Sequence, residues 1–215
     1  MITVLTLGNI KSLDSDIILK IISLMPYERR ERAFNMREMP QKENAACYGL
    51  LLYGLKNLYS YSGKIEFSYG EYEKPYIKDG PFFNFSHCEN SAVCAFSDFE
   101  VGVDIQQPST PSNGVIKRVC TENEQEMLTL HGEFSRLWTQ KESILKYRGV
   151  GISGMKELPD LSTYDKNSTA YNICDFFLNT FCINGNSVSV CGEESEVRIR
   201  EIQVCEFLDF IKTVD

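Results

Sequence analysis

The chain has 215 residues, of which 43% are hydrophobic and 24% charged, and this composition excludes a fibrous, repetitive or disordered chain. The length suffices for one larger domain or two small ones. Lys and Arg number 22 against 30 Asp and Glu, which gives a formal net charge of −8 at pH 7. A chain this acidic is not expected to bind nucleic acid, and any anion that it binds must meet a local basic cluster.

The histidines and cysteines exclude several kinds of metal and redox site. The two histidines, His87 and His131, form no HExxH motif, and none of the eight cysteines forms a C-x-x-C pair. Residues 1–16 lack a signal sequence, and no apolar run reaches the roughly 18 residues that a membrane span requires. We therefore expect a cytoplasmic protein with mostly buried, reduced thiols and no membrane partner.

The first seventy residues are predicted to be mainly helical. Asp14 supplies a helix-start side chain, and the isoleucines that follow it form one apolar face at Ile17, Ile18, Ile21 and Ile22. A short charged stretch covers residues 27–36. Pro40 then opens a longer helical pattern with one face turned toward a core.

Strands are predicted in the middle of the chain, where aromatic and β-branched runs begin at about residue 74. They cover Phe82–Phe85, Ala92–Ser97 and Val101–Gln106. Thr121 and Glu124 then form a capping-box pattern, which predicts a helix to about residue 131.

A second helix is predicted over Phe134–Tyr147, and Gly149 stands where a left-handed C-cap would end it. Three further strands are expected, over residues 171–177, 180–183 and 187–191. The last two flank Asn184-Gly185-Asn186, which is typical of a hairpin turn. Helices followed by an antiparallel sheet thus occur twice, and the sequence predicts an α+β fold.

The strand Val101–Gln106 carries the first candidate functional residues. Alternation turns its branched apolar residues toward a core and leaves Gly102, Asp104 and Gln106 on the opposite face. The oxygens of Asp104 and Gln106 could hold a hard cation such as Mg2+. The alternative, which this segment alone favours, is a half-buried edge strand with its polar residues facing solvent.

Glu142 and Lys146 lie four residues apart on one face of the predicted helix. They could form a surface ion pair worth about 0.3 kcal/mol. They could instead supply a carboxylate to a metal site and an ammonium group to a phosphate oxygen. Glu124 has a simpler explanation, because a capping box accounts for a Glu at that position.

Two further groups could contact an anion. Ser86 and His87 lie just past a predicted strand, where a phosphate contact and a purely structural histidine are both possible. The densest basic run contains Arg29, Arg30 and Arg32. It is either a solvated helix face or the anion-binding cluster that the net charge requires.

Four segments in this order and spacing resemble the 4'-phosphopantetheinyl transferases of the surfactin-synthetase-activating (Sfp-like) type. They are Lys74-Pro75-Tyr76, Phe83-Asn84-Phe85-Ser86-His87, Gly102-Val103-Asp104-Ile105 and Trp138-Thr139-Gln140-Lys141-Glu142-Ser143-Ile144-Leu145-Lys146. The resemblance implies a monomer of two similar α/β halves related by a pseudo-twofold axis. Residues 1–101 would contact the adenine and phosphates of coenzyme A, and residues 102–215 would carry the Mg2+ site and the carrier-docking surface.

The resemblance also implies a reaction. The 4'-phosphopantetheine arm of coenzyme A would move to a serine of an acyl or peptidyl carrier protein, with release of 3',5'-ADP. The alternative from another class is a non-catalytic module that binds coenzyme A or a carrier protein. A general nucleotide phosphotransferase would need a GxxxxGK[ST] loop, and the sequence contains none.

Matching positions give each candidate residue an implied role. Asp104 and Glu142 would bind Mg2+ and Lys146 the pyrophosphate. The general base would be Glu142 or Glu124, with Glu142 favoured because Glu124 already has a capping role. The remaining contacts to coenzyme A would come from Ser86 and His87 at its phosphates, Lys74 at its adenine, and Arg29 and Arg32 at its 3'-phosphate.

Two positions depart from the family pattern. Gln106 stands where many members have a Glu in the metal site, so one negative charge is missing and the affinity for Mg2+ is expected to be lower. Cys47 stands about where the family often has an Arg for the 3'-phosphate, so weaker selectivity for coenzyme A over its dephospho form is expected. The carrier protein is expected to dock on the residues after Gln106 and on the helix that begins at Thr121.

Overall fold

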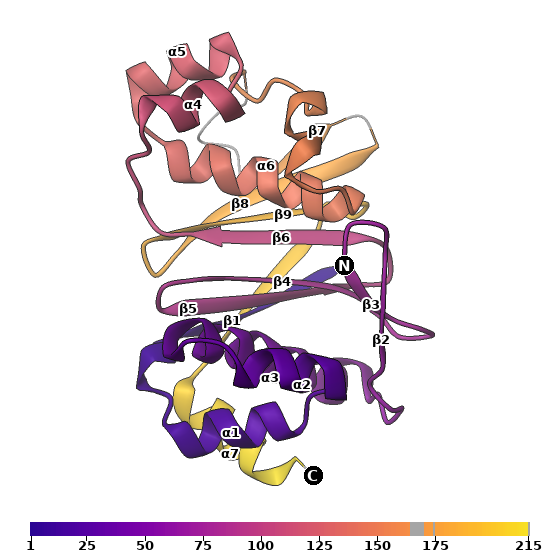
Figure 1. The fold of residues 1–215 in the computed structure, drawn as a ribbon. Helices are drawn as coiled ribbons and strands as arrows, with labels where there is room; N and C mark the ends of the chain where they lie inside the picture. The colour runs from indigo at the N-terminus through magenta and orange to yellow at the C-terminus, as the bar shows by residue number, and fades with distance from the viewer. Residues whose placement is uncertain (164–169, 174, 215) are drawn as a thin grey trace.

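A computed structural model describes residues 1–163, 170–173 and 175–214. Two sheets are stacked face to face, and helices cover the outer side of each (Figure 1). Four helices lie on the side of the N-terminal sheet, namely α1 (Ser15–Ser23), α2 (Tyr27–Phe34), α3 (Glu38–Tyr59) and α7 (Val204–Thr213). On the other side lie α4 (Asn113–Val119), α5 (Glu122–His131) and α6 (Phe134–Arg148). This mixed architecture confirms the predicted fold class.

The first sheet has the strand order β10-β1-β5-β4. Its strands are β1 (Ile2–Gly8), β4 (Phe82–Cys88), β5 (Ser91–Ser97) and β10 (Val197–Ile202). β1 runs parallel to β10 and antiparallel to β5. A separate two-stranded hairpin, β2 (Phe67–Tyr69) and β3 (Pro75–Ile77), projects beside this sheet (Figure 1).

The second sheet is antiparallel and has the order β6-β9-β8-β7. Its strands are β6 (Val101–Gln106), β7 (Ala170–Ile173), β8 (Phe176–Ile183) and β9 (Asn186–Gly192). The turn between β8 and β9 has left-handed φ angles of 51° at Asn184 and 79° at Gly185, as the predicted hairpin requires. Two short 3-10 helices, Ile10–Ser12 and Ile152–Glu157, complete the described elements.

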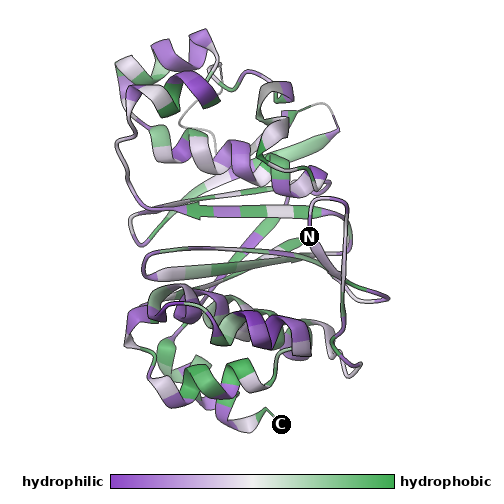
Figure 2. Cartoon of the chain, in the orientation of Figure 1, coloured by the Kyte–Doolittle hydropathy of each residue, from purple (hydrophilic) through white to green (hydrophobic). Residues whose placement is uncertain are grey.

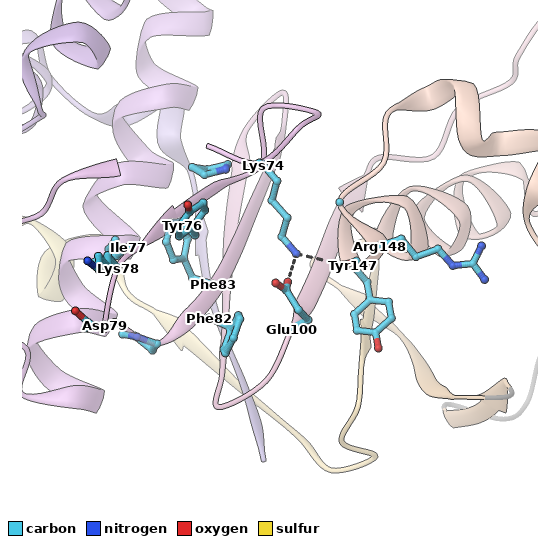
Figure 3. A pocket seen from close by; sticks show the side chains of 15 residues that line it. Lys74, Tyr76, Ile77, Lys78, Asp79, Phe82, Phe83, Glu100, Tyr147 and Arg148 are labelled. Carbon is cyan, nitrogen blue, oxygen red and sulfur yellow. Dashed lines mark hydrogen bonds and ion pairs between the residues drawn. The ribbon is translucent and has the colours of Figure 1, made fainter. Parts of the chain in front are cut away.

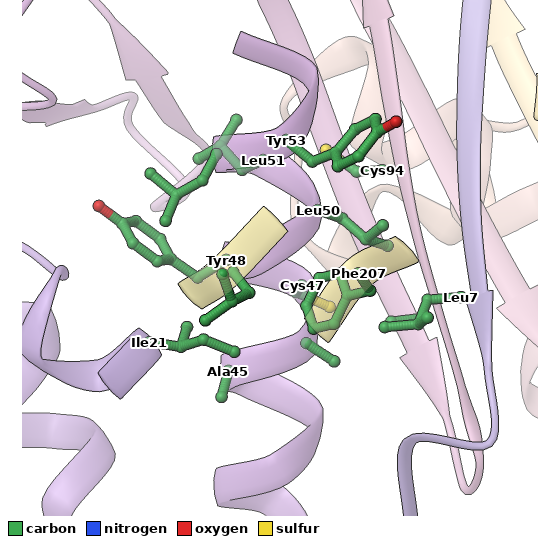
Figure 4. Close-up of a cluster of buried hydrophobic side chains, with 14 of the residues drawn as sticks. Leu7, Ile21, Ala45, Cys47, Tyr48, Leu50, Leu51, Tyr53, Cys94 and Phe207 are labelled. Atoms are coloured by element: carbon green, nitrogen blue, oxygen red, sulfur yellow. The ribbon is translucent and has the colours of Figure 1, made fainter. Parts of the chain in front are cut away.

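Two apolar layers stabilise the N-terminal half. Between α3 and the first sheet, a core includes Cys47, Tyr48 and Phe207, all at most 1% exposed (Figure 4). Between the two sheets, a second layer contains the inward side chains of β6, which confirms the predicted alternation; its buried members are Ile2, Val4, Cys88, Val93, Ala95, Val101, Val103, Ile105, Val188 and Val190. Along β6, hydrophobic residues (green) alternate with hydrophilic or neutral ones (purple or white) in Figure 2.

Several predicted helix ends are confirmed by their hydrogen bonds. The Asp14 side chain accepts from the Ile17 N–H at 2.9 Å and caps α1. Thr121 and Glu124 form the complete capping box of α5. Gly149, with a φ angle of 63°, is the left-handed C-cap of α6.

The C-terminal segment lies in a different half from the one that the sequence predicted. Residues 102–215 were expected to form the second half, but β10 pairs with β1 and α7 buries Phe207 and Ile211 in the core of the first half. The reason is that β1, also not predicted, leaves an open edge that β10 fills. The predicted strand at residues 171–177 is interrupted as well: β7 ends at Ile173 and β8 begins at Phe176, while residue 174 is outside the described residues.

All seven cysteines within the described residues are free thiols, and four of them are buried. Among the same residues, no helix combines the length and the apolar character that a membrane crossing requires.

Candidate active site

The candidate site lies where α6 crosses β6. A Cβ atom built on Gly102 would lie 2.1 Å from the Ser143 carbonyl oxygen and 2.3 Å from the Tyr147 nitrogen. No other residue can therefore occupy position 102 without moving the helix. Because the backbones touch here, Glu142 and Lys146 are brought against the polar face of β6.

Lys146 connects the two halves of the molecule. Its Nζ lies 2.6 Å from Asp104 Oδ1 and donates to Ser86 Oγ at 2.9 Å. The Ser86 hydroxyl in turn donates to Asp104 Oδ1 at 2.6 Å. Asp104 is 6% exposed, so its carboxylate does not face solvent, as it would in the alternative of a half-buried strand with solvated polar residues. Three of the predicted residues thus meet at one point.

Asn84 holds the free edge of β6 next to this cluster. β6 is the end strand of its sheet, so the backbone of Val103 has no strand partner on that side. Asn84 Oδ1 accepts from the Val103 N–H at 3.0 Å, and Lys146 donates to the Val103 carbonyl at 3.2 Å. These two bonds satisfy the backbone N–H and the backbone carbonyl of Val103 and fix β6 beside β4.

Glu142 belongs to the same electrostatic group. Burial raises the pKa of its carboxyl group above the ordinary value; nearby Lys146 lowers this pKa and Asp104 raises it. A carboxyl group with a raised pKa is suited to accept a proton. Burial is the largest cause of the raised pKa of Glu142, so this carboxyl group lies in a partly desolvated environment.

The donor atoms of this site fit a hard cation. Asp104 and Glu142 offer carboxylate oxygens, and Gln106, on the same face of β6 as Asp104, offers an amide oxygen. Among the described residues, no group of three His, Cys, Asp or Glu side chains could hold a metal. In this donor set, the amide at position 106 leaves two carboxylates, Asp104 and Glu142, as charged ligands.

A cavity of about 630 Å³ opens between the β2–β3 hairpin, β4 and the end of α6 (Figure 3). Lys74 lines it, together with the exposed rings of Tyr76 and Phe82. The ammonium group of Lys74 is bound to Glu100 at 2.5 Å and to two backbone carbonyls. The segment Lys74-Pro75-Tyr76 is thus placed in a cavity whose walls come from both halves.

Arg29 is held beneath the first sheet's edge by aromatic rings. Its guanidinium carbon lies 4.8 Å from the centre of the Phe85 ring and 5.4 Å from that of Phe67. Burial lowers the pKa of Arg29, and its Nε is buried with no hydrogen-bond partner among the described residues. The side chain also has a hydrogen bond with Tyr69, so the unpaired Nε is the donor of this partly buried cation that is suited to an anion.

The other predicted phosphate contacts differ in exposure. Arg32 is exposed on α2. His87 Nδ1 lies 3.3 Å from Glu43 Oε2; burial lowers the pKa of His87, whereas Glu43 raises it. Cys47 is fully buried in α3 (Figure 4). Its Sγ lies 3.5 Å from the Ser86 carbonyl oxygen. Cys47 therefore lies under the backbone of Ser86, with its side chain closed to solvent.

Glu124 is occupied by structural contacts. It is fully buried, with Oε2 at 2.7 Å from Lys141 Nζ and at 2.8 Å from the Thr121 nitrogen. Its Oε1 accepts from the Leu161 N–H at 3.0 Å. Lys141 also donates to the Val119 carbonyl at 2.9 Å. These contacts of Glu124 thus join α5 to α6.

Sequence reasoning did not identify two residues that shape the site. Asn84 belongs to the segment Phe83-Asn84-Phe85-Ser86-His87, but only the stacking of the two sheets shows that its side chain contacts β6. Lys141 stands at a position of the apolar repeat of α6. The repeat alone does not indicate that its ammonium group forms an ion pair with Glu124 in the core. The signal available for Lys141 was a lysine at a predicted core position, which requires a buried partner.

Comparisons with known proteins point to one family. Residues 100–198 match the family model described as the 4'-phosphopantetheinyl transferase superfamily. The chain is 38% identical over 97 residues to the 4'-phosphopantetheinyl transferase ffp of Bacillus subtilis, and 36% identical over 97 residues to Sfp of the same species (strain 168). Each match covers 41% of this chain and 43% of the relative.

A longer match links the chain to a eukaryotic relative. It is 31% identical over 160 residues to the L-aminoadipate-semialdehyde dehydrogenase-phosphopantetheinyl transferase of Candida glabrata, which is 66% of this chain and 62% of the relative. The chain thus spans less than half of the Bacillus relatives and less than two thirds of this one. The match of residues 100–198 to the 4'-phosphopantetheinyl transferase superfamily, together with these relatives, confirms the resemblance indicated by the four segments.

Proposed function

We propose that this protein transfers the 4'-phosphopantetheine arm of coenzyme A to a serine of an acyl or peptidyl carrier protein and releases 3',5'-ADP. The observation that carries the proposal is the meeting of Lys146, Asp104 and Ser86 within 3 Å at the joint between the halves, with Glu142 in the same electrostatic group. In such a cluster, the ammonium group is suited to bind phosphate oxygens and the carboxylates are suited to bind a metal ion.

Coenzyme A would bind across the joint. The cavity with Tyr76 and Phe82 would take the adenine ring, against the alkyl part of Lys74. Ser86 and His87 would contact the phosphates. Arg29, with its unpaired buried Nε, and the exposed Arg32 would meet the 3'-phosphate.

Mg2+ fits the donor set of Asp104, Glu142 and Gln106. When bound, it would supply positive charge to the pyrophosphate oxygens. The chain's own residues would do the rest. The ammonium group of Lys146 would move partly away from Asp104 and bind a pyrophosphate oxygen. Negative charge builds up on the leaving group as its bond to phosphorus breaks, and Lys146 would neutralise that charge.

Glu142 would act as the general base. It would accept the proton of the carrier serine as the serine oxygen forms a bond to the phosphorus of the phosphopantetheine arm. The bond from that phosphorus to the bridging oxygen breaks, and 3',5'-ADP leaves with the electron pair. Glu124 was the other candidate for this role, and its contacts with Lys141, Thr121 and Leu161 favour a structural role instead.

The competing proposal is a non-catalytic module that binds coenzyme A or a carrier protein. The test is incubation with an apo carrier protein, coenzyme A and Mg2+, followed by measurement of the intact carrier mass. A carrier that gains one phosphopantetheine supports the transferase. If no adduct forms with any divalent metal tried but coenzyme A binds measurably, the transferase is excluded and the non-catalytic binding module is supported.

A second comparison concerns the 3'-phosphate. Because Cys47 is closed to solvent and Glu43 faces His87, the 3'-phosphate would be met by Arg29 and Arg32 alone, and we expect only a weak preference in kcat/KM for coenzyme A over dephospho-coenzyme A. The same mass assay with either substrate measures the ratio. We further propose that the protein acts as a cytoplasmic monomer without nucleic-acid or membrane partners, which size measurement in solution and cell fractionation would test.

A further inference from the structure

Lys74 originates in the N-terminal half, but its ammonium group is bound to the other half. It follows the turn between β2 and β3, and its Nζ donates to the Val101 carbonyl at 3.1 Å and to the Tyr147 carbonyl at 3.3 Å. It also pairs with Glu100 at 2.5 Å (Figure 3). The Lys74 side chain is 16% exposed and that of Glu100 47%, so the contacts with the carbonyls are the better shielded ones.

The two carbonyls lie on either side of the crossing between β6 and α6. Val101 directly precedes Gly102, and Tyr147 is the residue whose nitrogen would lie 2.3 Å from a Cβ at position 102. Tyr147 is also in the last turn of α6, where carbonyl groups lack partners within the helix. A cation there is further stabilised by the negative end of the helix dipole.

Lys74 is itself held in place by the hairpin. Its own carbonyl accepts from the Gly70 N–H at 3.0 Å, and the preceding Glu73 has a left-handed φ of 61°. Phe67 of β2 packs against Tyr48 and Phe83, with ring centres 6.2 and 5.9 Å apart. The hairpin is therefore anchored to the N-terminal half, and Lys74 is its contact with β6 and α6.

We propose that Lys74 is a positioning residue that locks the crossing of β6 and α6, and that it thereby sets Asp104, Glu142 and Lys146 at working distance from one another. The kinetic test of this inference rests on the proposed function, because kcat and KM are measured for the transfer reaction. It gives the ammonium group of Lys74 a role within the protein, whereas the alkyl part remains free to line the cavity.

Three substitutions separate these roles. Lys74→Met keeps an unbranched apolar side chain of similar length and removes the charge, so we expect kcat to fall about ten- to a hundredfold, with a change of less than about twofold in the KM for coenzyme A. Lys74→Arg should restore most of kcat. Glu100→Gln removes only the exposed ion pair and should change kcat by less than about twofold.

A second measurement does not depend on catalysis. Hydrogen exchange of the amides of Tyr147–Val150, in protein without substrate, should become faster in Lys74→Met and return toward the wild-type rate in Lys74→Arg. Lys64→Met is the matched control, because Lys64 forms a fully exposed pair with Glu66 in the same half. It should leave both the exchange and the kinetics unchanged.

Each outcome decides between alternatives. A raised KM for coenzyme A with an unchanged kcat in Lys74→Met would make the ammonium group a ligand contact and overturn the proposal. Unchanged exchange at the end of α6 would overturn it as well. If the wild-type protein transfers nothing, the proposed function fails, while the exchange measurement still decides whether Lys74 locks the crossing.

Discussion

Lys141 and Glu142 are neighbours on α6, but their side chains have different partners. Lys141 is 2% exposed and forms a buried ion pair with Glu124. Glu142 instead lies in the electrostatic group of Asp104 and Lys146. One helix thus carries a stabilising ion pair and the candidate base on adjacent residues.

Glu142→Gln should abolish transfer and leave the fold intact, because the lost charge is at the proposed metal site rather than in the core. The intact-mass assay and circular dichroism measure the two effects. Glu196→Gln is the control, since Glu196 is exposed in the loop before β10. A Glu142→Gln variant with the wild-type rate would contradict the assignment of Glu142 as base or ligand.

The same substitution should change stability with pH. Because burial raises the pKa of Glu142 in the folded protein, ionisation of this group favours the unfolded state. Its contribution to stability is present at acid pH and is lost as the pH rises through the folded-state value. In chelator-treated protein, Glu142→Gln should therefore melt at a higher temperature than wild type at pH 7. The difference should vanish below the unfolded-state pKa of a glutamate, and equal melting temperatures at both pH values would contradict this.

Glu124→Gln should act on stability rather than on chemistry. It leaves the ammonium group of Lys141 buried without a counter-charge, which typically costs about 3–5 kcal/mol of unfolding free energy. Urea unfolding measures this loss, and transfer should persist at a temperature where the variant is folded. Glu122→Gln, at an exposed position of the same helix, should be neutral. If folded Glu124→Gln is inactive, Glu124 takes part in the reaction.

Gln106→Glu should tighten the dependence on Mg2+. A third carboxylate at the site would strengthen the binding free energy of Mg2+ by roughly 1.4 kcal/mol, which lowers the half-saturating Mg2+ concentration about tenfold. Transfer should be preserved or improved. Gln107→Glu places the same charge one residue further along and should leave the Mg2+ titration unchanged. An identical titration for Gln106→Glu and wild type would show that residue 106 is not a ligand.

Gly102→Ala should disrupt the crossing itself. The added methyl group would lie 2.1 Å from a backbone oxygen of α6, so either the helix or the strand must shift. We expect a loss of about 1–3 kcal/mol of unfolding free energy and a large loss of transfer. Gly114→Ala is the control, because only Ser112 Oγ lies near a Cβ at that position, at 3.9 Å. An active, stable Gly102→Ala would show that the contact is not tight.

The sequence by itself determined several local elements and the residue types of the site. Periodicity, the capping box at Thr121 and the C-cap at Gly149 depend on neighbouring residues, so they could be identified without the fold. The alternation in β6 likewise separated its core face from the face with Asp104. The four segments were sufficient to indicate the family.

Only the tertiary structure decided which residues meet. β1 and β10 are far apart in the chain, and their pairing places α7 in the first half. The bonds from Asn84 to Val103 and from Lys74 to Tyr147 cross the joint between the halves. Such contacts depend on how the two sheets stack and on how closely α6 approaches Gly102. Those distances are set by packing between distant segments, which local sequence patterns do not encode.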